Sequence, residues 1–88
     1  METEAEIIRQ KMFFPEFPYY LSFFKLINNK TDTVKVEIQS KVHKGNIFLM
    51  PHTWTKEFIA KNPGEFRDDV FRHTINRFGL KRQPVKYL

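Results

Sequence analysis

Cysteine is absent from this 88-residue chain, and glycine occurs only three times. Without cysteine there can be no disulfide bond, no cysteine-ligated zinc site and no thiol nucleophile. The three glycines are well separated in the sequence, so there is no glycine-rich loop of the kind that cradles phosphate groups. These two scarcities exclude several common classes of enzyme and metal-binding protein.

Candidates for catalytic residues are also few. The only serines are Ser22, inside an apolar stretch, and Ser40, which has no evident base and third group beside it. The histidines, His43, His52 and His73, lie on separate predicted elements without the spacing of metal ligands. We therefore expect no enzymatic activity, no bound metal and no cofactor.

Long apolar runs are missing as well, since no stretch approaches the roughly 20 residues needed to cross a bilayer. The first ten residues, METEAEIIRQ, are acidic and lack the basic start and apolar middle of a secretory signal. We expect an intracellular protein, in the cytoplasm or in the interior of a host cell, without a membrane partner.

Aromatic residues, by contrast, are abundant: there are ten phenylalanines, three tyrosines and one tryptophan. Seven of these rings fall between residues 13 and 24. A domain this short buries only about 60–65% of its unfolded surface, so it must build its core from a few large side chains. The first interpretation of the aromatic segment is therefore core. The second is an exposed patch for a partner, which would use Phe13, Phe14, Phe17, Tyr19 and Tyr20.

A helix is predicted over residues 4 to 13. Thr3 and Glu6 have the spacing of a capping box, and apolar residues follow at helical intervals. The prolines of the run FPEFP, residues 14 to 18, then end the helix and form a rigid, extended elbow.

Three strands are predicted next. Residues 19–27 fit a helix by spacing but a strand by residue type, and we predict a strand. Residues 28–32, NNKTD, suit a hairpin loop. Residues 33–42 alternate apolar and polar side chains, as in a strand with one solvent-exposed face. Residues 47–50 form a third, buried strand, which the following proline stops.

Two helices are predicted after the strands. Thr53 is placed to cap a short helix that ends near Lys61. The run NPGE at residues 62–65 carries the strongest start signal in the chain, with a capping Asn and a Pro at the first helical position. This second helix would run to Phe78 and stop at Gly79 in the left-handed conformation.

The predicted fold class is therefore α+β, in the order α-β-β-β-α-α. A three-stranded antiparallel meander would carry the helices packed on it. We predict a single globular domain over residues 1–80 and a basic C-terminal tail over residues 81–88.

The formal charge of +5 is unevenly distributed along the chain. Residues 1–16 carry a net charge of −2, residues 17–60 carry +3 and residues 61–88 carry +4. Such a gradient favours a polyanionic partner at the C-terminal end, although many basic soluble domains bind no nucleic acid.

The last predicted helix offers the most specific functional pattern. Its apolar side leaves Arg72 and Asn76 facing outward, and these side chains match the edges of guanine and adenine. Positive charge continues past the helix end, where it can contact phosphates. The sequence predicts a small non-enzymatic protein that binds nucleic acid, DNA or RNA, through Arg72, Asn76, Arg77, Lys81, Arg82, Lys41 and Lys44.

The alternative is a protein–protein interaction module, such as a small inhibitor or accessory subunit of viral or phage origin. It would use the aromatic segment, with another protein or a second copy of this chain as the partner. No basic residue lies between Met12 and Phe24. We therefore expect the aromatic segment to serve the core or a protein contact rather than to stack bases.

Overall fold

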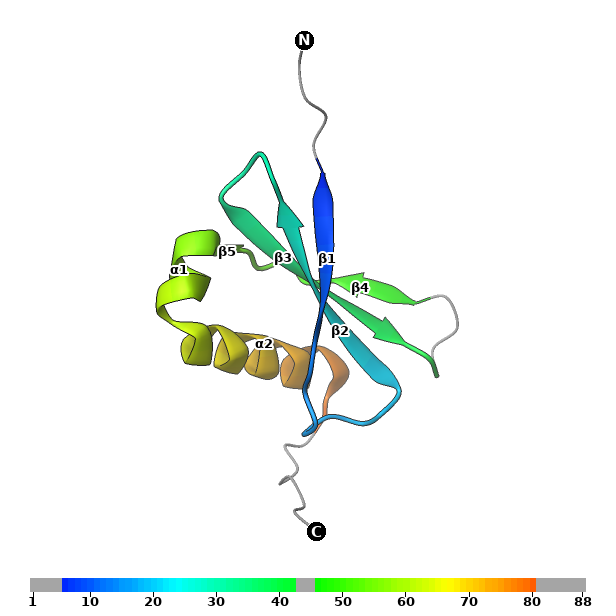
Figure 1. Cartoon of the computed structure of the whole chain (residues 1–88). Coiled ribbons are helices and arrows are strands. Elements are labelled where there is room, and N and C mark those ends of the chain that lie inside the picture. The colour runs from blue at the N-terminus through cyan, green and yellow to red at the C-terminus, as the bar shows by residue number, and fades with distance from the viewer. Residues whose placement is uncertain (1–5, 43–45, 81–88) are drawn as a thin grey trace.

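The computed structural model describes residues 6–42 and 46–80. Five strands come first: β1 (Ile7–Met12), β2 (Leu21–Asn28), β3 (Thr33–Ser40), β4 (Ile47–Leu49) and β5 (Trp54–Thr55). Two helices follow, α1 (Lys56–Lys61) and α2 (Pro63–Phe78) (Figure 1). The order is therefore β-β-β-β-β-α-α, so the predicted order α-β-β-β-α-α is wrong, and so is the predicted three-stranded meander, because the sheet has five strands.

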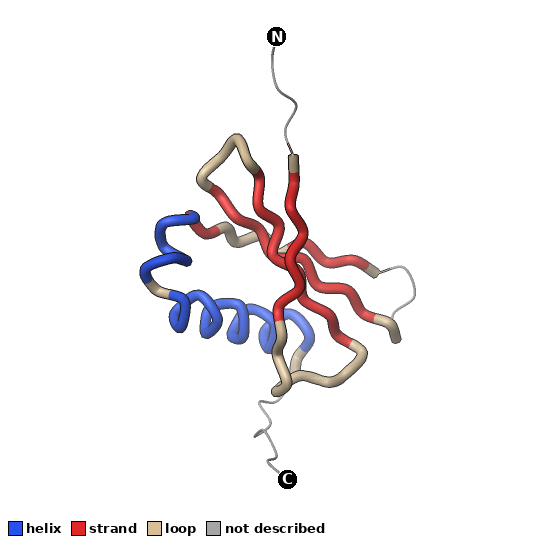
Figure 2. The backbone as a smooth tube through the Cα atoms, viewed as in Figure 1, coloured by secondary structure: helices blue, strands red, loops and turns tan. Residues whose placement is uncertain are grey.

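The strands form one antiparallel sheet in the order β1-β2-β3-β4 (Figure 2). β5 pairs with the beginning of β3, at Thr33↔Thr55, whereas β4 pairs with its later part, from Glu37 to Gln39. β4 and β5 therefore follow each other along the same edge of β3. The prediction of a strand rather than a helix for residues 19–27 is confirmed by β2, and the loop over residues 28–32 joins β2 to β3.

The predicted helix over residues 4 to 13 is wrong. Its described part forms β1, which pairs with β2 from Ile7↔Asn28 to Met12↔Phe23. The backbone N–H and C=O groups along that edge of β2 need partners, and β1 supplies them. This long-range pairing overrides the helical spacing of a short segment that has few apolar contacts of its own.

α2 packs across one face of the sheet (Figure 1). Phe23, Ile38, Phe66 and Val70 meet there, and each is at most 3% exposed. Burial of large apolar side chains in this layer is the main favourable contribution to the stability of a chain this short.

The aromatic segment contributes to this core only in part. Phe14, Phe17 and Phe23 are buried, and the ring centres of Phe17 and Phe23 are 5.2 Å apart. Phe13 and Tyr19 are exposed instead, by 77% and 88%. The core interpretation is thus confirmed for some of the rings, and others are left at the surface.

α2 has the predicted bounds. Pro63 occupies the first helical position, although the side chain of the preceding Asn62 makes no capping hydrogen bond. Gly79 ends the helix with a φ of 63°, the left-handed region that glycine adopts most readily. The backbone N–H groups of Gly79 and Leu80 both donate to the carbonyl oxygen of Ile75, the second at 3.2 Å, and so close the last turn of the helix.

α1 begins two residues later than predicted. The cap is Thr55, whose hydroxyl oxygen accepts a hydrogen bond from the backbone N–H of Phe58 at 3.0 Å. Thr53, the predicted cap, precedes β5, a strand of two residues that the sequence pattern did not indicate. The pairing of β5 with β3 therefore displaces the helix start along the chain.

Because α2 covers only one face of the sheet, substitution of two isoleucines on neighbouring strands should lower the free energy of unfolding by different amounts. Ile38 of β3 is 1% exposed and Ile47 of β4 is 59% exposed. We expect Ile38→Val to lower the free energy of unfolding by about 0.5–1.5 kcal/mol and Ile38→Ala by about 2–5 kcal/mol. The matched change Ile47→Ala should alter it by no more than about 0.5 kcal/mol. Urea denaturation measures all three, and equal losses at both positions would contradict this packing.

Candidate nucleic-acid interface

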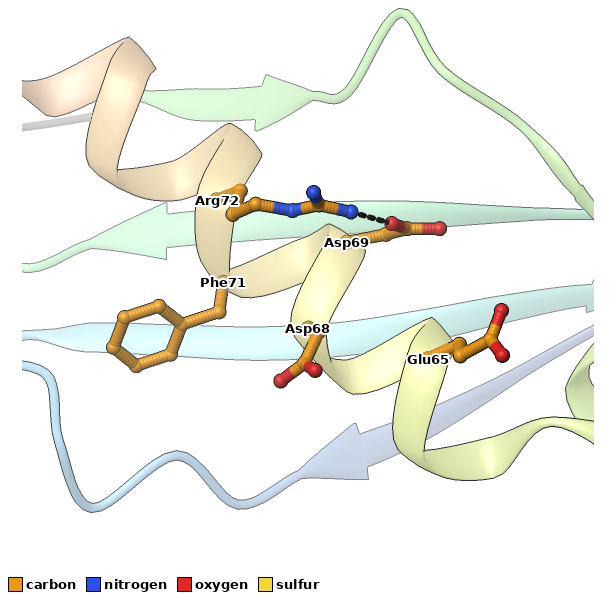
Figure 3. A pocket seen from close by; sticks show the side chains of 5 residues that line it. All are labelled: Glu65, Asp68, Asp69, Phe71 and Arg72. Atoms are coloured by element: carbon orange, nitrogen blue, oxygen red, sulfur yellow. Dashed lines mark hydrogen bonds and ion pairs between the residues drawn. The ribbon is translucent and has the colours of Figure 1, made fainter.

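The predicted contact residues of α2 are exposed, but they do not form a positive surface. Arg72 makes an ion pair with Asp69, one helical turn earlier (Figure 3). The guanidinium carbon of Arg77 lies 4.6 Å from the centre of the Phe48 ring. Over its whole length α2 carries three arginines and three carboxylates, so its formal charge is zero.

A surface hollow on α2 shows the effect of these carboxylates. It has a volume of about 430 Å³, and all the described residues that line it come from α2. In Figure 3 the Asp69 carboxylate meets the guanidinium of Arg72, whereas the carboxylates of Glu65 and Asp68 point elsewhere. Three carboxylates beside one guanidinium make this part of α2 unfavourable for phosphate groups.

Positive charge gathers instead on the face of the sheet that α2 does not cover. Alternate residues of β3, from Val34 to Ser40, are buried toward α2, so the residues between them point to the opposite face. Paired residues of antiparallel strands share a face, which extends this assignment to the neighbouring strands. We call this surface the open face, and it comprises Ile7, Arg9, Lys11, Ser22, Phe24, Leu26, Asn28, Thr33, Lys35, Glu37, Gln39, Ile47 and Leu49.

Cations outnumber carboxylates on the open face. Arg9, Lys11 and Lys35 belong to it, and the exposed Lys41 directly follows β3. The one carboxylate, that of Glu37, is paired with Arg9 at 3.3 Å. No ion pair is found for the three lysines within the described part of the chain. Their charge therefore remains available to an anionic partner.

A hollow at one end of the open face brings two of these lysines together with aromatic rings. We call it the elbow hollow; its volume is about 320 Å³, and it lies between the β1–β2 loop and the end of β3. Lys11 and Lys41, which are far apart in sequence, both line it, and so do the exposed rings of Phe13 and Tyr19. The remaining lining residues are Met12, Phe14, Pro15, Phe17, Pro18, Leu21, Ser22 and Phe23.

α2 holds the elbow in place from the other side. The guanidinium of Arg67 donates a hydrogen bond of 2.9 Å to the backbone carbonyl of Phe13 and lies 4.2 Å from the centre of the Phe14 ring. The Phe17 ring packs on Phe71 of α2, with 4.6 Å between ring centres. These contacts fix the backbone of the loop, so the exposed rings project from a supported position.

The rings of the predicted partner patch are thus divided by the structure. Phe14 and Phe17 are core residues and are not accessible to a partner, and Tyr20 is half-buried. Of the predicted nucleic-acid contacts, Lys41 lies at the elbow hollow. Lys44, Lys81 and Arg82 lie outside the described residues.

A separate polar cluster links β5 to α2. The indole N–H of Trp54 donates to an Asp69 carboxylate oxygen at 3.2 Å, and the rings of His52 and His73 are stacked with 4.9 Å between centres. The indole hydrogen bond holds the pKa of Asp69 below its ordinary value; partial burial opposes this, and the positive charges of Arg72 and His52 add to it. Within the described residues, no three His, Asp or Glu side chains are arranged to hold a metal ion.

Comparison with protein-family profiles, with curated proteins and with solved structures gave no significant match. None of the described helices has the length and apolar character needed to cross a membrane.

The lowered pKa of Asp69 predicts a pH-dependent contribution to stability. Because the folded pKa lies below the unfolded one, the contribution is present above the ordinary value of 3.8 and is lost as the pH falls through the lowered pKa. Asp69→Asn should therefore be destabilised relative to the natural chain at neutral pH, and the difference should shrink below about pH 4.

Urea denaturation followed by fluorescence measures this difference, because Trp54 is the only tryptophan and lies in the contact itself. Asp68→Asn is the matched control, since it removes the neighbouring carboxylate without affecting the indole hydrogen bond. If the difference in free energy of unfolding between Asp69→Asn and the natural chain did not change with pH, the lowered pKa of Asp69 would be contradicted.

Proposed function

We propose that this protein binds single-stranded nucleic acid on the open face, with the elbow hollow as the principal contact. The observation that supports this most strongly is the meeting of Lys11 and Lys41 with the exposed rings of Phe13 and Tyr19. Lysines neutralise backbone phosphates, and aromatic rings offer surfaces on which bases stack whatever their sequence. The contact set keeps the sequence-predicted Lys41 and adds Lys11 and the two rings.

The rest of the open face can continue the binding surface away from the hollow. Arg9 and Lys35 lie in one row across the sheet, because both pair with Leu26. The guanidinium of Arg9 lies 3.6 Å from the centre of the Phe24 ring. An arginine plane stacked on an aromatic ring is a surface on which a base can add, and Lys35 supplies a further cation for phosphate.

Single strands suit this surface better than duplexes. The faces of the bases are hidden inside a duplex, so exposed rings would gain no stacking from it. An intracellular location, as the sequence predicts, would place the protein where DNA and RNA strands occur. The proposal requires binding alone and assigns no chemical reaction.

Removal of the two hollow lysines should weaken binding and lower its dependence on salt. We expect the double variant Lys11→Gln, Lys41→Gln to bind a thymidine oligonucleotide of about 16 nucleotides less tightly than the natural chain. The slope of log K against log salt should become less negative by about 0.7 for each phosphate that is no longer neutralised, or about 1.4 for two. Fluorescence anisotropy of a labelled strand over a series of salt concentrations measures both effects.

The double variant Lys56→Gln, Lys61→Gln is the matched control, because it also removes two lysines, from α1, and neither of them lines the elbow hollow. Its effect on affinity and on the salt slope should be clearly smaller. If the Lys11 and Lys41 double variant and the control behaved alike, phosphate binding at the elbow hollow would be refuted.

A second candidate function is the interaction module predicted from the aromatic segment. The observation that favours it is the number of apolar side chains left exposed on the sheet and the elbow, among them Ile7, Ile47, Leu49, Phe13 and Tyr19. Exposed apolar side chains of this kind mark contact surfaces between proteins. A protein partner would depend on the rings but not on the lysines, so the lysine variants separate the two functions.

A further inference from the structure

Another cavity lies at the edge of the sheet, between β4 and the later half of α2. Its volume is about 270 Å³, which is below the range of about 300–1,000 Å³ typical of pockets that bury drug-sized ligands. Its walls are mainly apolar, from Phe48, Leu49 and Met50, and polar side chains of α2 stand beside them. Apolar walls with a few polar groups are typical of a ligand site, and the small volume suits a single planar ring system.

The polar groups at this cavity are available to a ligand. Asn76 is exposed, and its amide makes no hydrogen bond with the residues that the structure describes. Arg77 makes no ion pair among the same residues, and its guanidinium lies against the Phe48 ring. An amide offers a donor and an acceptor side by side, which matches the donor and acceptor on the edge of adenine. A guanidinium can stack on a base or contact phosphate.

The cavity and the open face share one residue. Leu49 lines the cavity, and its pairing with Glu37 also places it on the open face. β4 has only three residues and no further strand on its outer side among the described elements. A single-stranded nucleic acid that lies on the open face can therefore pass around β4 and reach the cavity without crossing another described helix or β-strand.

We propose that this cavity takes one unstacked base of the strand bound on the open face, and that Asn76 makes adenine the preferred base. This inference rests on the proposed function and adds sequence preference to it. The phosphate and ring contacts of the open face are indifferent to base identity, whereas a polar pocket for one base edge is not. Asn76 and Arg77, both predicted contacts, would then act at the β4 edge and not along the outer side of α2.

This inference is tested by comparing the affinity for adenine-containing and cytosine-containing strands, in the natural chain and in Asn76→Ala. The probes are thymidine oligonucleotides of about 16 nucleotides that carry either adenine or cytosine at the same internal positions. We expect the natural chain to bind the adenine strand at least about five-fold more tightly, the lower end of what one bidentate contact contributes. Asn76→Ala should bind both strands with the affinity that the natural chain has for the cytosine strand.

Arg72→Ala is the matched control, because it shortens another exposed side chain of α2 that does not line the cavity. It should keep the adenine preference. The inference is overturned if the natural chain binds both strands equally, or if Asn76→Ala retains the preference; in either case weaker binding by the Lys11 and Lys41 double variant would leave the proposed function intact. If the natural chain bound neither strand, the proposed function and this inference would both fail.

Discussion

A single long helix, α2, packs on one face of the sheet and determines which side chains are buried and which reach the surface. α1 has six residues and no buried side chain, whereas α2 has sixteen and supplies Phe66, Val70 and Phe71 to the core. One helix covers one face, and within residues 6–42 and 46–80 no other element covers the opposite face. That face contacts solvent, and Arg9, Lys11 and Lys35 on it, with Lys41 just after β3, give it an excess of positive charge. The same helix anchors the elbow through Arg67, which places exposed rings beside two of the lysines.

Local sequence signals were sufficient to predict the helix and the strand that bury one apolar face, α2 and β3. The alternation along β3 and the start and stop signals of α2 predicted both elements because burial and capping there depend on residues close in sequence. β1 and β5 could not be predicted in this way. β1 is almost wholly exposed and exists through its hydrogen bonds to β2, and β5 has two residues whose position is fixed by the start of β3. The helical spacing of residues 4 to 13 did not predict their secondary structure. These residues contribute little to the core, and their hydrogen bonds to β2 determine their conformation.

The candidate site was predictable only in part, for a related reason. Counting charge along the chain indicated the C-terminal end, but the guanidinium of Arg72 is paired with Asp69 and α2 as a whole is neutral. The lysines of the elbow hollow come from β1 and from the end of β3, and the sheet topology alone brings them together. No basic residue lies between Met12 and Phe24, but the fold places Lys11 and Lys41 beside the rings, and the linear sequence does not show this proximity. Alternation in β3 already indicated that Lys35 and Lys41 point away from the core.

NMR mapping of a bound oligonucleotide distinguishes binding on the open face from binding along α2. The ¹H–¹⁵N spectrum of the natural chain would be recorded as a thymidine oligonucleotide of about 16 nucleotides is added. The account predicts that the largest changes in chemical shift fall on β1, the elbow and the outward residues of β2 and β3, with Asp68 and Arg72 of α2 unaffected. Changes confined to the exposed side of α2, or no change at saturating strand, would contradict it.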